Sequence, residues 1–598
     1  MPNITEMIYS NDYADYILPY ANRDITSTYV EYGAQLLDSH YFLLHDNRQN
    51  PTFPIRSPYD IFNEYLFMPK LFVPLSTVSL EESGIIQAQI QPYLNLSGKG
   101  TILGFIDSGI DYTHKAFRTK DGNTRLLGIW DQTNPDLSQT VQNTFAQTDS
   151  DQMTTNNSSA NPYHYGIIYN EEQINQALQS ENPLSIVPVT DESGHGTALA
   201  GIAAGTPYPE NDFTGAAFDA KLCVVKLKPA KQYLREYYFA NENAILYQEN
   251  DIMMGINYLI AIAEKENKPL IICLGLGTNQ GDHAGNSPVS KMITNRSYDT
   301  YTIFSIASGN EGNKAHHYFH QFSSAAFHAN QPANNTNSQI DEIELLVPSG
   351  TSGFISEIWG STNALYSIGF QSPLGTQIAP VTASPGKNDL ISFVLEKTKI
   401  QLSYSIVPES GGDQLVILRF EQPVEGNWII RVYNRGETNV SFHMWLPISN
   451  VLAADITFLK PDPETTLTVP SDADSSITTG FYNAYSNGIV AESGRGFTRD
   501  NLVKPNVITP GINVTAPSAN NQFRPFSGSS AATALLAGGI SQLQQWRLDS
   551  DIPSIINANS MNAYITRGAI RDNELNYPNP VSGYGKTNIY NVFQSLMS

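Results

Sequence analysis

The sequence predicts an α/β fold in which helices cover both faces of a parallel β-sheet and an antiparallel β-sandwich interrupts the chain. From about residue 98, apolar segments of strand length alternate with helical segments, which is typical of a parallel sheet buried on both faces. Between residues 321 and 465 the pattern changes to short alternating segments separated by turns, as in a sandwich or jelly roll. The earlier pattern then resumes. We therefore expect four segments, at 1–75, 76–320, 321–465 and 466–598.

Composition limits the class of protein. The chain has 598 residues, of which 41% are hydrophobic, so it can build several cores. Its net charge of −23 argues against nucleic acid and against an anionic membrane as partners. The first residues lack a basic stretch followed by an apolar one, and no segment is long enough to span a bilayer. We therefore expect a protein without a signal peptide, located in the cytoplasm or associated with a spore.

Strands and helices alternate in the segment before the sandwich. Buried strands are expected within "GKGTILGFIDSGID", "AKLCVVKLK", "PLIICLGLG" and "TYTIFSIASGN", and helices within "YNEEQINQALQS", "ESGHGTALAGIAAG" and "NDIMMGINYLIAIAEKENK". The two cysteines, Cys223 and Cys273, lie inside apolar strands, so we interpret them as core residues and expect no disulfide. Residues 131–162 are polar and should form an exposed, mobile loop.

The remaining segments complete the α/β pattern. Trp359, Trp428 and Trp445 lie in alternating segments of the sandwich and are expected in its core. After the sandwich, "SSITTGFYNA" and "VKPNVITPGINVTAPS" indicate further strands. The stretch "FSGSSAATALLAGG" then enters an alanine-rich run with apolar residues at three-and-four spacing, which predicts a buried helix with Ser530 in its first turn.

Four polar residues in short motifs become informative only when they are taken together. Asp107 in "GFIDSGID" and Asn310 in "SIASGNEGN" follow apolar strands, His195 in "SGHGT" begins a helix, and Ser530 begins another. Alone, each is most simply a turn or helix-cap residue. Nucleophilic catalysis by serine needs a base, a carboxylate that orients the base, and preset donors for the oxyanion. The four residues supply each role once, which predicts a serine hydrolase.

The motifs "DSGID", "SGHGT", "ASGNEG" and "SGSSAA" resemble those of the subtilisin-like serine proteases, over roughly residues 86–320 and 466–598. The resemblance implies that Asp107 orients His195, that His195 is the general base and that Ser530 is the nucleophile. It also implies that Asn310 and the Ser530 backbone N–H bind the oxyanion. By the family pattern, a substrate-binding edge strand contains Gly275, Leu276 and Gly277, with Ser308 near the pocket for the residue before the cut.

Within that family the sequence is most similar to the clostridial Csp germination proteases, in "GTNQGDHAG", in the inserted sandwich and in "TRGAIRDNELNYPNPVSGYGKTNIY". The resemblance implies a serine endopeptidase that acts on protein or peptide without a cofactor or metal. It also implies a prodomain at residues 1–75, cut by Ser530 between Pro74 and Gly84 and retained as an inhibitor. Ala198, Gly275 and Ala534 depart from the usual family residues, which affects the expected pocket shape and not the reaction.

Other interpretations remain. A pseudoprotease that senses or binds on the same fold is the main alternative, although such relatives replace catalytic residues and this chain has all of them. The sandwich could instead carry the main function by binding carbohydrate or protein, whereas we expect it to be a structural and regulatory insert without catalytic groups. His316, His317 and His320 in "KAHHYFH" could bind a metal, but a polar loop leading into the insert is the favoured interpretation.

Overall fold

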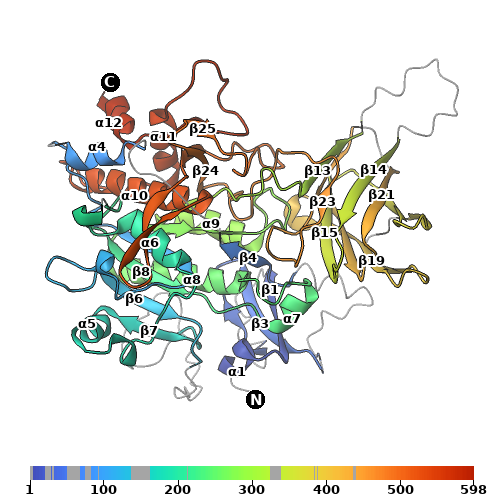
Figure 1. The fold of residues 1–598 in the computed structure, drawn as a ribbon, viewed down its shortest axis with the longest axis horizontal. Coiled ribbons are helices and arrows are strands. Elements are labelled where there is room, and N and C mark those ends of the chain that lie inside the picture. The colour runs from blue at the N-terminus through green and yellow to red at the C-terminus, as the bar shows by residue number, and fades with distance from the viewer. Residues whose placement is uncertain are drawn as a thin grey trace.

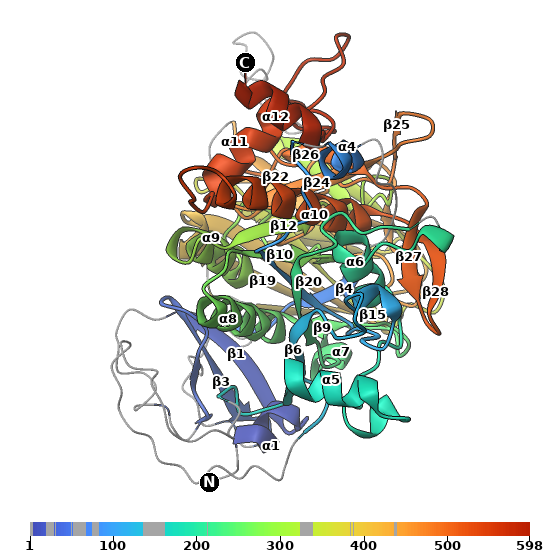
Figure 2. The ribbon, with the colours of Figure 1, turned by 90° about the vertical axis from the view of Figure 1, so that its left-hand side faces the viewer.

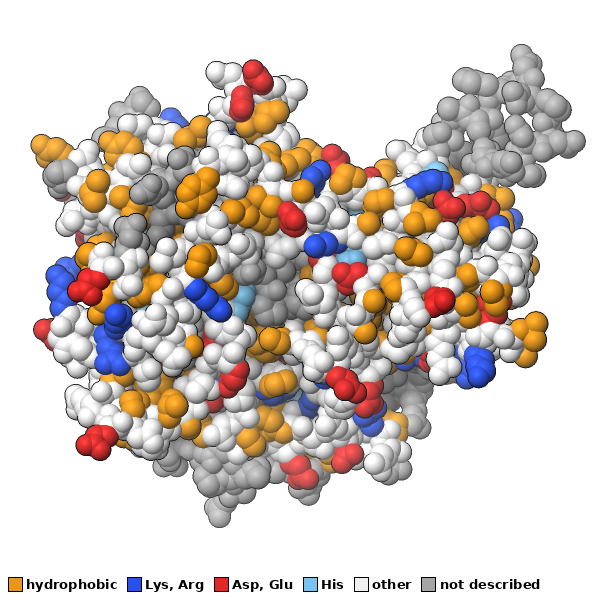
Figure 3. Space-filling view, viewed as in Figure 1, with side chains coloured by type: hydrophobic (Ala, Val, Ile, Leu, Met, Phe, Trp, Pro, Cys, Tyr) orange, Lys and Arg blue, Asp and Glu red, His pale blue; other side chains and the backbone are white. Residues whose placement is uncertain are grey.

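The structure is a computed structural model. The residues that it describes are 4–19, 29, 32–49, 51, 67–74, 83–91, 93–135, 162–211, 213–322, 339–382, 384, 386, 388–435 and 439–597. Most of the loop expected at 131–162 lies outside them. No helix in these ranges is both long enough and apolar enough to cross a lipid bilayer. On the face shown in Figure 3, acidic side chains are scattered over the surface among uncharged and hydrophobic ones.

A nine-stranded sheet forms the centre of the α/β part (Figure 1). Its six inner pairings are parallel, whereas the short edge strands β7 and β25 pair antiparallel. Both faces of the inner strands are buried, which explains why their sequences are continuously apolar. In spatial order the strands are β25 (Gly488–Ile489), β24 (Ile477–Asn483), β12 (Ile303–Ala307), β10 (Leu270–Leu274), β5 (Ile102–Asp107), β8 (Lys221–Lys226), β6 (Leu126–Asp131) and β7 (Ile167–Asn170), and β26 (Val507–Pro510) also pairs with β24.

Helices cover both faces of this sheet, as predicted. On one face lie α6 (His195–Ala204) and α10 (Ser529–Leu548), and on the other lie α8 (Glu249–Glu266) and α9 (Pro288–Asp299) (Figure 2). The small residues of α10 allow close packing, since a Cβ at Gly538 would come within 2.3 Å of the Ala216 Cβ. The other α-helices in the described ranges are α1 (Ile4–Tyr9), α4 (Ile85–Ile90), α5 (Glu171–Gln179), α7 (Gln232–Tyr237), α11 (Ala558–Gly568) and α12 (Ile589–Met597).

The insertion is a sandwich of two antiparallel sheets, at the right in Figure 1. Trp359, Trp428 and Trp445 are buried in its core, as predicted. One sheet has the order β13 (His317–Gln321), β22 (Ser441–Trp445), β15 (Gly353–Gly360), β20 (Asp413–Glu421), β19 (Lys399–Val407) and β18 (Asn388–Ser392). The other has the order β17 (Gln377–Val381), β16 (Tyr366–Gln371), β21 (Gly426–Asn434), β14 (Ile340–Val347) and β23 (Thr457–Phe458). The expected polar loop at "KAHHYFH" is wrong, because His317 begins an edge strand and is buried.

The N-terminal region packs between the sheet and the sandwich. It contains α1 and a three-stranded antiparallel sheet of β1 (Tyr13–Pro19), β3 (Tyr41–Asn47) and β2 (Gln35–Leu36). Side chains alternate between the faces of β1, so Tyr16 and Leu18 join the core that contains the sandwich, whereas Ile17 joins the core under α8. The N-terminal region is thus held by both other parts of the molecule.

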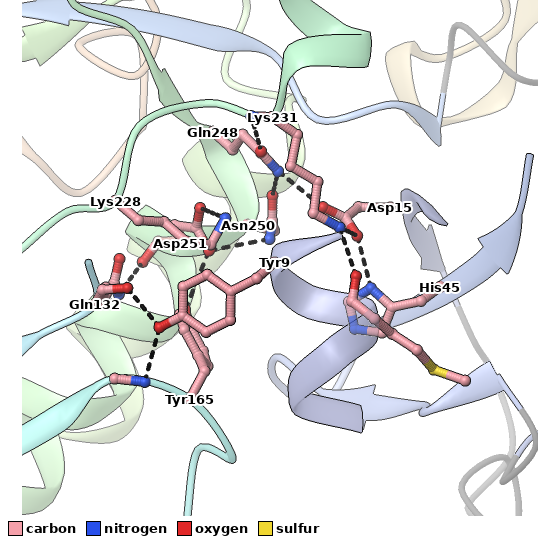
Figure 4. A network of polar contacts seen from close by, with 12 residues as sticks. Tyr9, Asp15, His45, Gln132, Tyr165, Lys228, Lys231, Gln248, Asn250 and Asp251 are labelled. Atoms are coloured by element: carbon pink, nitrogen blue, oxygen red, sulfur yellow. Dashed lines mark hydrogen bonds and ion pairs between the residues drawn. The ribbon is translucent and has the colours of Figure 1, made fainter. Parts of the chain in front are cut away.

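A buried polar network fixes the N-terminal region on the α/β part (Figure 4). Lys231 Nζ lies 2.7 Å from Asp15 Oδ1, and His45 Nδ1 lies 2.6 Å from the same oxygen. Gln248 donates to Asp15 Oδ2 at 2.9 Å. Burial alone would raise the pKa of the Asp15 carboxyl, but Lys231 and His45 beside it hold that pKa below its usual range. The carboxylate therefore stays charged and paired inside the protein.

Replacing Lys231 with methionine should lower the free energy of unfolding by about 3–5 kcal/mol, because Asp15 would stay buried without its cation. Urea titration of both proteins measures this difference. Lys221→Met is the matched control: Lys221 pairs with Glu171 at the surface, so its loss should cost at most about 1 kcal/mol. Equal effects of the two substitutions would contradict the importance of the buried pair.

Candidate active site

Asp107 and His195 meet at the carboxyl edge of the parallel sheet. Asp107 is the last residue of β5 and His195 is the first residue of α6. His195 Nδ1 lies 2.7 Å from Asp107 Oδ1, and both side chains are buried. The carboxylate can thus hold the proton on Nδ1, which makes Nε2 the acceptor nitrogen of the ring.

Ser530 lies on the other side of this imidazole. It is the second residue of α10, as predicted, and its Oγ lies 3.3 Å from His195 Nε2 and 3.2 Å from the Gly275 carbonyl oxygen. Phe526 packs its ring edge-on against the imidazole, with 5.4 Å between ring centroids. The arrangement lets the hydroxyl proton pass to a neutral histidine.

Asn310 lies beside the start of α10. Its side-chain oxygen accepts a hydrogen bond from the Ser529 backbone N–H at 3.0 Å. Because the oxygen is engaged in this way, the amide nitrogen remains a donor. Asn310 and Gly528 also line a cavity of about 430 Å³, to which the polar residues Glu311, Asp455 and Glu492 contribute. A side-chain amide donor and the first N–H groups of a helix therefore lie next to the Ser530 hydroxyl.

Asp191 is a site residue that the sequence reasoning missed. Its carboxylate accepts hydrogen bonds from the Gly194 N–H at 2.9 Å and the Thr197 N–H at 2.8 Å, at the start of the helix that carries His195. It also accepts from Ser108 Oγ at 2.8 Å, and the Ser108 N–H donates to Asp107. Asp191 thus joins the two elements that carry the Asp–His pair. An acidic residue just before the helix of "DESGHGT" was the available signal.

The predicted substrate edge strand is already paired. β11 (Leu276–Gly277) pairs antiparallel with β4 (Leu71–Pro74), and β4 pairs on its other side with β9 (Tyr247–Gln248). The N-terminal region thus places an extended strand between two strands of the α/β part. Phe72 is fully buried there. Ser308, the residue after β12, is buried, its backbone bonds to Thr479 and Thr468, and its hydroxyl donates to the Gly309 carbonyl oxygen at 3.3 Å. Its place near the pocket for the residue before the cut stays a prediction.

No rival nucleophile or metal site is evident in the part of the chain that the structure describes. Burial raises the pKa of Cys223 to about 12 and the pKa of Cys273 well above its usual value, so neither thiol is reactive. Among the described residues, no three His, Cys, Asp or Glu side chains are grouped as metal ligands would be. His316, one of the three histidines considered for metal binding, is instead paired with Glu311 at 2.6 Å.

Comparison with known proteins decides the family. Residues 98–341 and 450–586, more than half of the chain, match the subtilase family, Peptidase_S8. The chain belongs to the subtilase family. The unmatched residues between the two segments contain most of the sandwich, which agrees with its interpretation as an insertion.

Relatives of this subtilase refine the comparison. The solved structure of the Clostridium perfringens CspB protease matches it with a TM-score of 0.72 and 28% identity, over 87% of this chain and 97% of that one. This match confirms the predicted similarity to the Csp branch. The PI-type proteinase of Lactococcus lactis subsp. cremoris and the PII-type proteinase of Lacticaseibacillus paracasei are each 20% identical over 82% of this chain. The subtilase spans about a quarter of the length of these two curated relatives.

Gly275 leaves room for the Ser530 hydroxyl. A Cβ at this position would lie 3.0 Å from Ser530 Oγ and 2.7 Å from Leu199 Cδ2. Gly275→Ala should therefore displace the hydroxyl and slow peptide hydrolysis at least about tenfold, because small misplacements of reacting groups are costly. Steady-state kinetics measure the effect. Gly488→Ala, at an exposed edge strand where the new Cβ would come only within 3.3 Å of Ser486, is the control. Wild-type rates for Gly275→Ala would contradict this steric role.

Proposed function

We propose that this subtilase is a serine endopeptidase that hydrolyses protein or peptide substrates. The observation that carries the proposal is the line of Asp107, His195 and Ser530 at hydrogen-bond distances, with 2.7 Å and 3.3 Å between the partners. Four residues assigned from separate motifs lie together at one edge of the sheet. Their roles, with Asp107 as orienter, His195 as general base, Ser530 as nucleophile and Asn310 as oxyanion donor, are part of the proposal.

The proposed reaction uses only this chain's own groups. Ser530 Oγ attacks the substrate carbonyl carbon while His195 Nε2 takes the hydroxyl proton, and the C–O bond forms as the carbonyl π bond opens. The Asn310 amide and the Ser530 N–H stabilise the resulting oxyanion. His195 then gives its proton to the leaving amine, and the C–N bond breaks. Water next attacks the acyl carbon while His195 takes one of its protons. His195 returns that proton to Ser530 Oγ as the ester C–O bond breaks and the carboxylic acid is released. Asp107 stabilises the imidazolium throughout.

Two adjacent serines provide the direct test. Ser530→Ala should abolish peptide hydrolysis, because it removes the hydroxyl whose oxygen lies 3.3 Å from His195 Nε2. Ser529→Ala should keep most activity, because the Ser529 backbone N–H, which the substitution retains, makes the contact with Asn310. Hydrolysis and fluorophosphonate labelling report the activity, and thermal unfolding confirms that both variants fold. Equal behaviour of the two variants, or residual cutting by Ser530→Ala, would refute the assignment.

We further propose that Ser530 cuts the chain itself and that the N-terminal region then remains as an inhibitor. β4 runs antiparallel to β11, with Val73 opposite Gly277 and Pro74 opposite Leu276. Pro74, the last residue of β4, is thus one register step from Gly275, whose carbonyl oxygen lies 3.2 Å from Ser530 Oγ. The proposed cut therefore lies between residues 75 and 76, at one end of the window from Pro74 to Gly84. The segment limits at 75, 320 and 465 remain proposals as well.

Intact mass distinguishes self-processing from a permanently attached N-terminal region. Wild type should give two fragments, 1–75 and 76–598, whereas Ser530→Ala should give one full-length chain. Ser76→Pro, which places a rigid ring directly after the proposed cut, should also stay uncut. Full-length masses for both wild type and Ser530→Ala would exclude self-processing and leave the cutting of other substrates open.

One observation favours a second candidate function. β4 is paired on both edges and occupies the position expected for a substrate strand. If β4 never leaves this position, no substrate can pair with β11, and the protein would be a binding or sensing protein on a protease fold. This alternative predicts no fluorophosphonate labelling of Ser530 in the wild type. Labelling that is lost only in Ser530→Ala favours the endopeptidase.

A further inference from the structure

Two segments of the sandwich, the one before β13 and the one after β22, contact the same carboxylate. His316, the residue before β13, contacts Glu311 Oε2 through Nδ1 at 2.6 Å. Ser449, four residues after β22, donates its backbone N–H to Glu311 Oε1 at 3.4 Å. The segment that leads into β13 and the segment that follows β22 are therefore joined by the side chain of Glu311, a residue that belongs to the α/β part.

The carboxylate is enclosed by further contacts. Glu311 and His316 are 3% and 1% exposed, respectively. Asn279 donates to Glu311 Oε2 at 3.1 Å and to the Leu446 carbonyl oxygen at 3.3 Å, which ties the same cluster to the end of β22. A buried carboxylate needs such partners, because a charge without them is strongly destabilising in the protein interior. Glu311 is thus an anchor and is not free to contact a substrate charge.

His316 depends on this carboxylate. Its Nε2 is buried and has no hydrogen-bond partner among the described residues, so the bond to Glu311 is the polar contact that orients the ring. Strands β13 and β22 pair in register from His317 opposite Trp445 onward. A displacement of β13 and β22 would therefore reach Glu311 through His316 before β13 and through Ser449 after β22.

Glu311 is also covalently next to Asn310. Asn310 holds the Ser529 N–H at 3.0 Å, and both Asn310 and Glu311 line the cavity of about 430 Å³ together with Ile448 and Ser449. A shift of the backbone at Glu311 would move the Asn310 amide. An error of about 1 Å in such a donor is enough to cost orders of magnitude in rate.

We infer that Glu311 is a positioning residue that couples the inserted sandwich to the oxyanion donor Asn310. The inference rests on the proposed function and extends it, because it makes the insertion part of the catalytic geometry although it supplies no reacting group. The sandwich acts on Asn310 through the Glu311–His316 and Glu311–Ser449 contacts. Anything that shifts the sandwich would then change the turnover rate more than substrate affinity.

A double-mutant cycle between Glu311 and Asn310 tests this coupling. In the full-length chain, Asn310→Ala should lower kcat by about 10²–10³-fold, as loss of one oxyanion donor does. Glu311→Ala should lower kcat about 10–100-fold with KM within about threefold of wild type. In the Asn310→Ala background, Glu311→Ala should change kcat less than about twofold, because the group through which it acts is already absent. Peptide hydrolysis and the rate of fluorophosphonate labelling provide two readouts.

Two variants separate positioning from general loosening of the sandwich. Glu311→Gln should keep kcat within about threefold of wild type, because its amide oxygen can take the place of Oε2 and accept from His316 and Asn279, and only the 3.4 Å contact with the Ser449 N–H is lost. Asp413→Ala removes a different contact between the two parts, the 2.6 Å pair with Arg499, and should lower the unfolding temperature with little change in kcat. If Glu311→Ala shows no cooperative unfolding transition, His316→Ala takes its place in the cycle.

The outcomes are distinct. Additive effects of Glu311→Ala and Asn310→Ala on kcat, or an equal loss of kcat in Asp413→Ala, would overturn the coupling while the proposed protease activity stands. Absence of any Ser530-dependent hydrolysis or labelling in the wild type would overturn both. A non-additive cycle together with recovery in Glu311→Gln supports the coupling.

Discussion

The parallel order of β5, β10 and β12 is the constraint on which the rest of the site depends. Parallel neighbours end at the same edge of a sheet, so Asp107, Gly275 and Asn310 come together although long stretches of chain separate them. Helices α6 and α10 begin at that edge and add His195 and Ser530. Antiparallel pairing at any of these positions would send one of the groups to the opposite edge.

Features carried by short local motifs were predictable from the sequence, and features set by distant pairing were not. Asp107, His195, Asn310 and Ser530 each stand at a strand end or helix start that neighbouring residues specify, and the structure places them together. The segment "KAHHYFH" was predicted to be a polar loop because the side chains that its histidines contact come together only in the folded chain. His317, for example, contacts His443, which is 126 residues away.

The N-terminal region explains a second group of features that the sequence could not predict. The side chains of β1 pack into two different cores. Asp15 forms its ion pair with Lys231, which is 216 residues further along the chain. The register of β4 on β11 likewise depends on where this whole region docks. Periodicity within a segment carries no information about which surface will cover each face of a strand.

The chain separation between the groups of the site has a consequence for protein synthesis. His195 and Ser530 are 335 residues apart, and the complete sandwich lies between them. At translation rates of about 5–20 residues per second, a ribosome needs roughly 17–67 s to cover that distance. During this interval the nascent chain contains the N-terminal region, His195 and much of the sheet, but not Ser530. The contact between His195 and Ser530 therefore cannot form before almost nine-tenths of the chain has been synthesised.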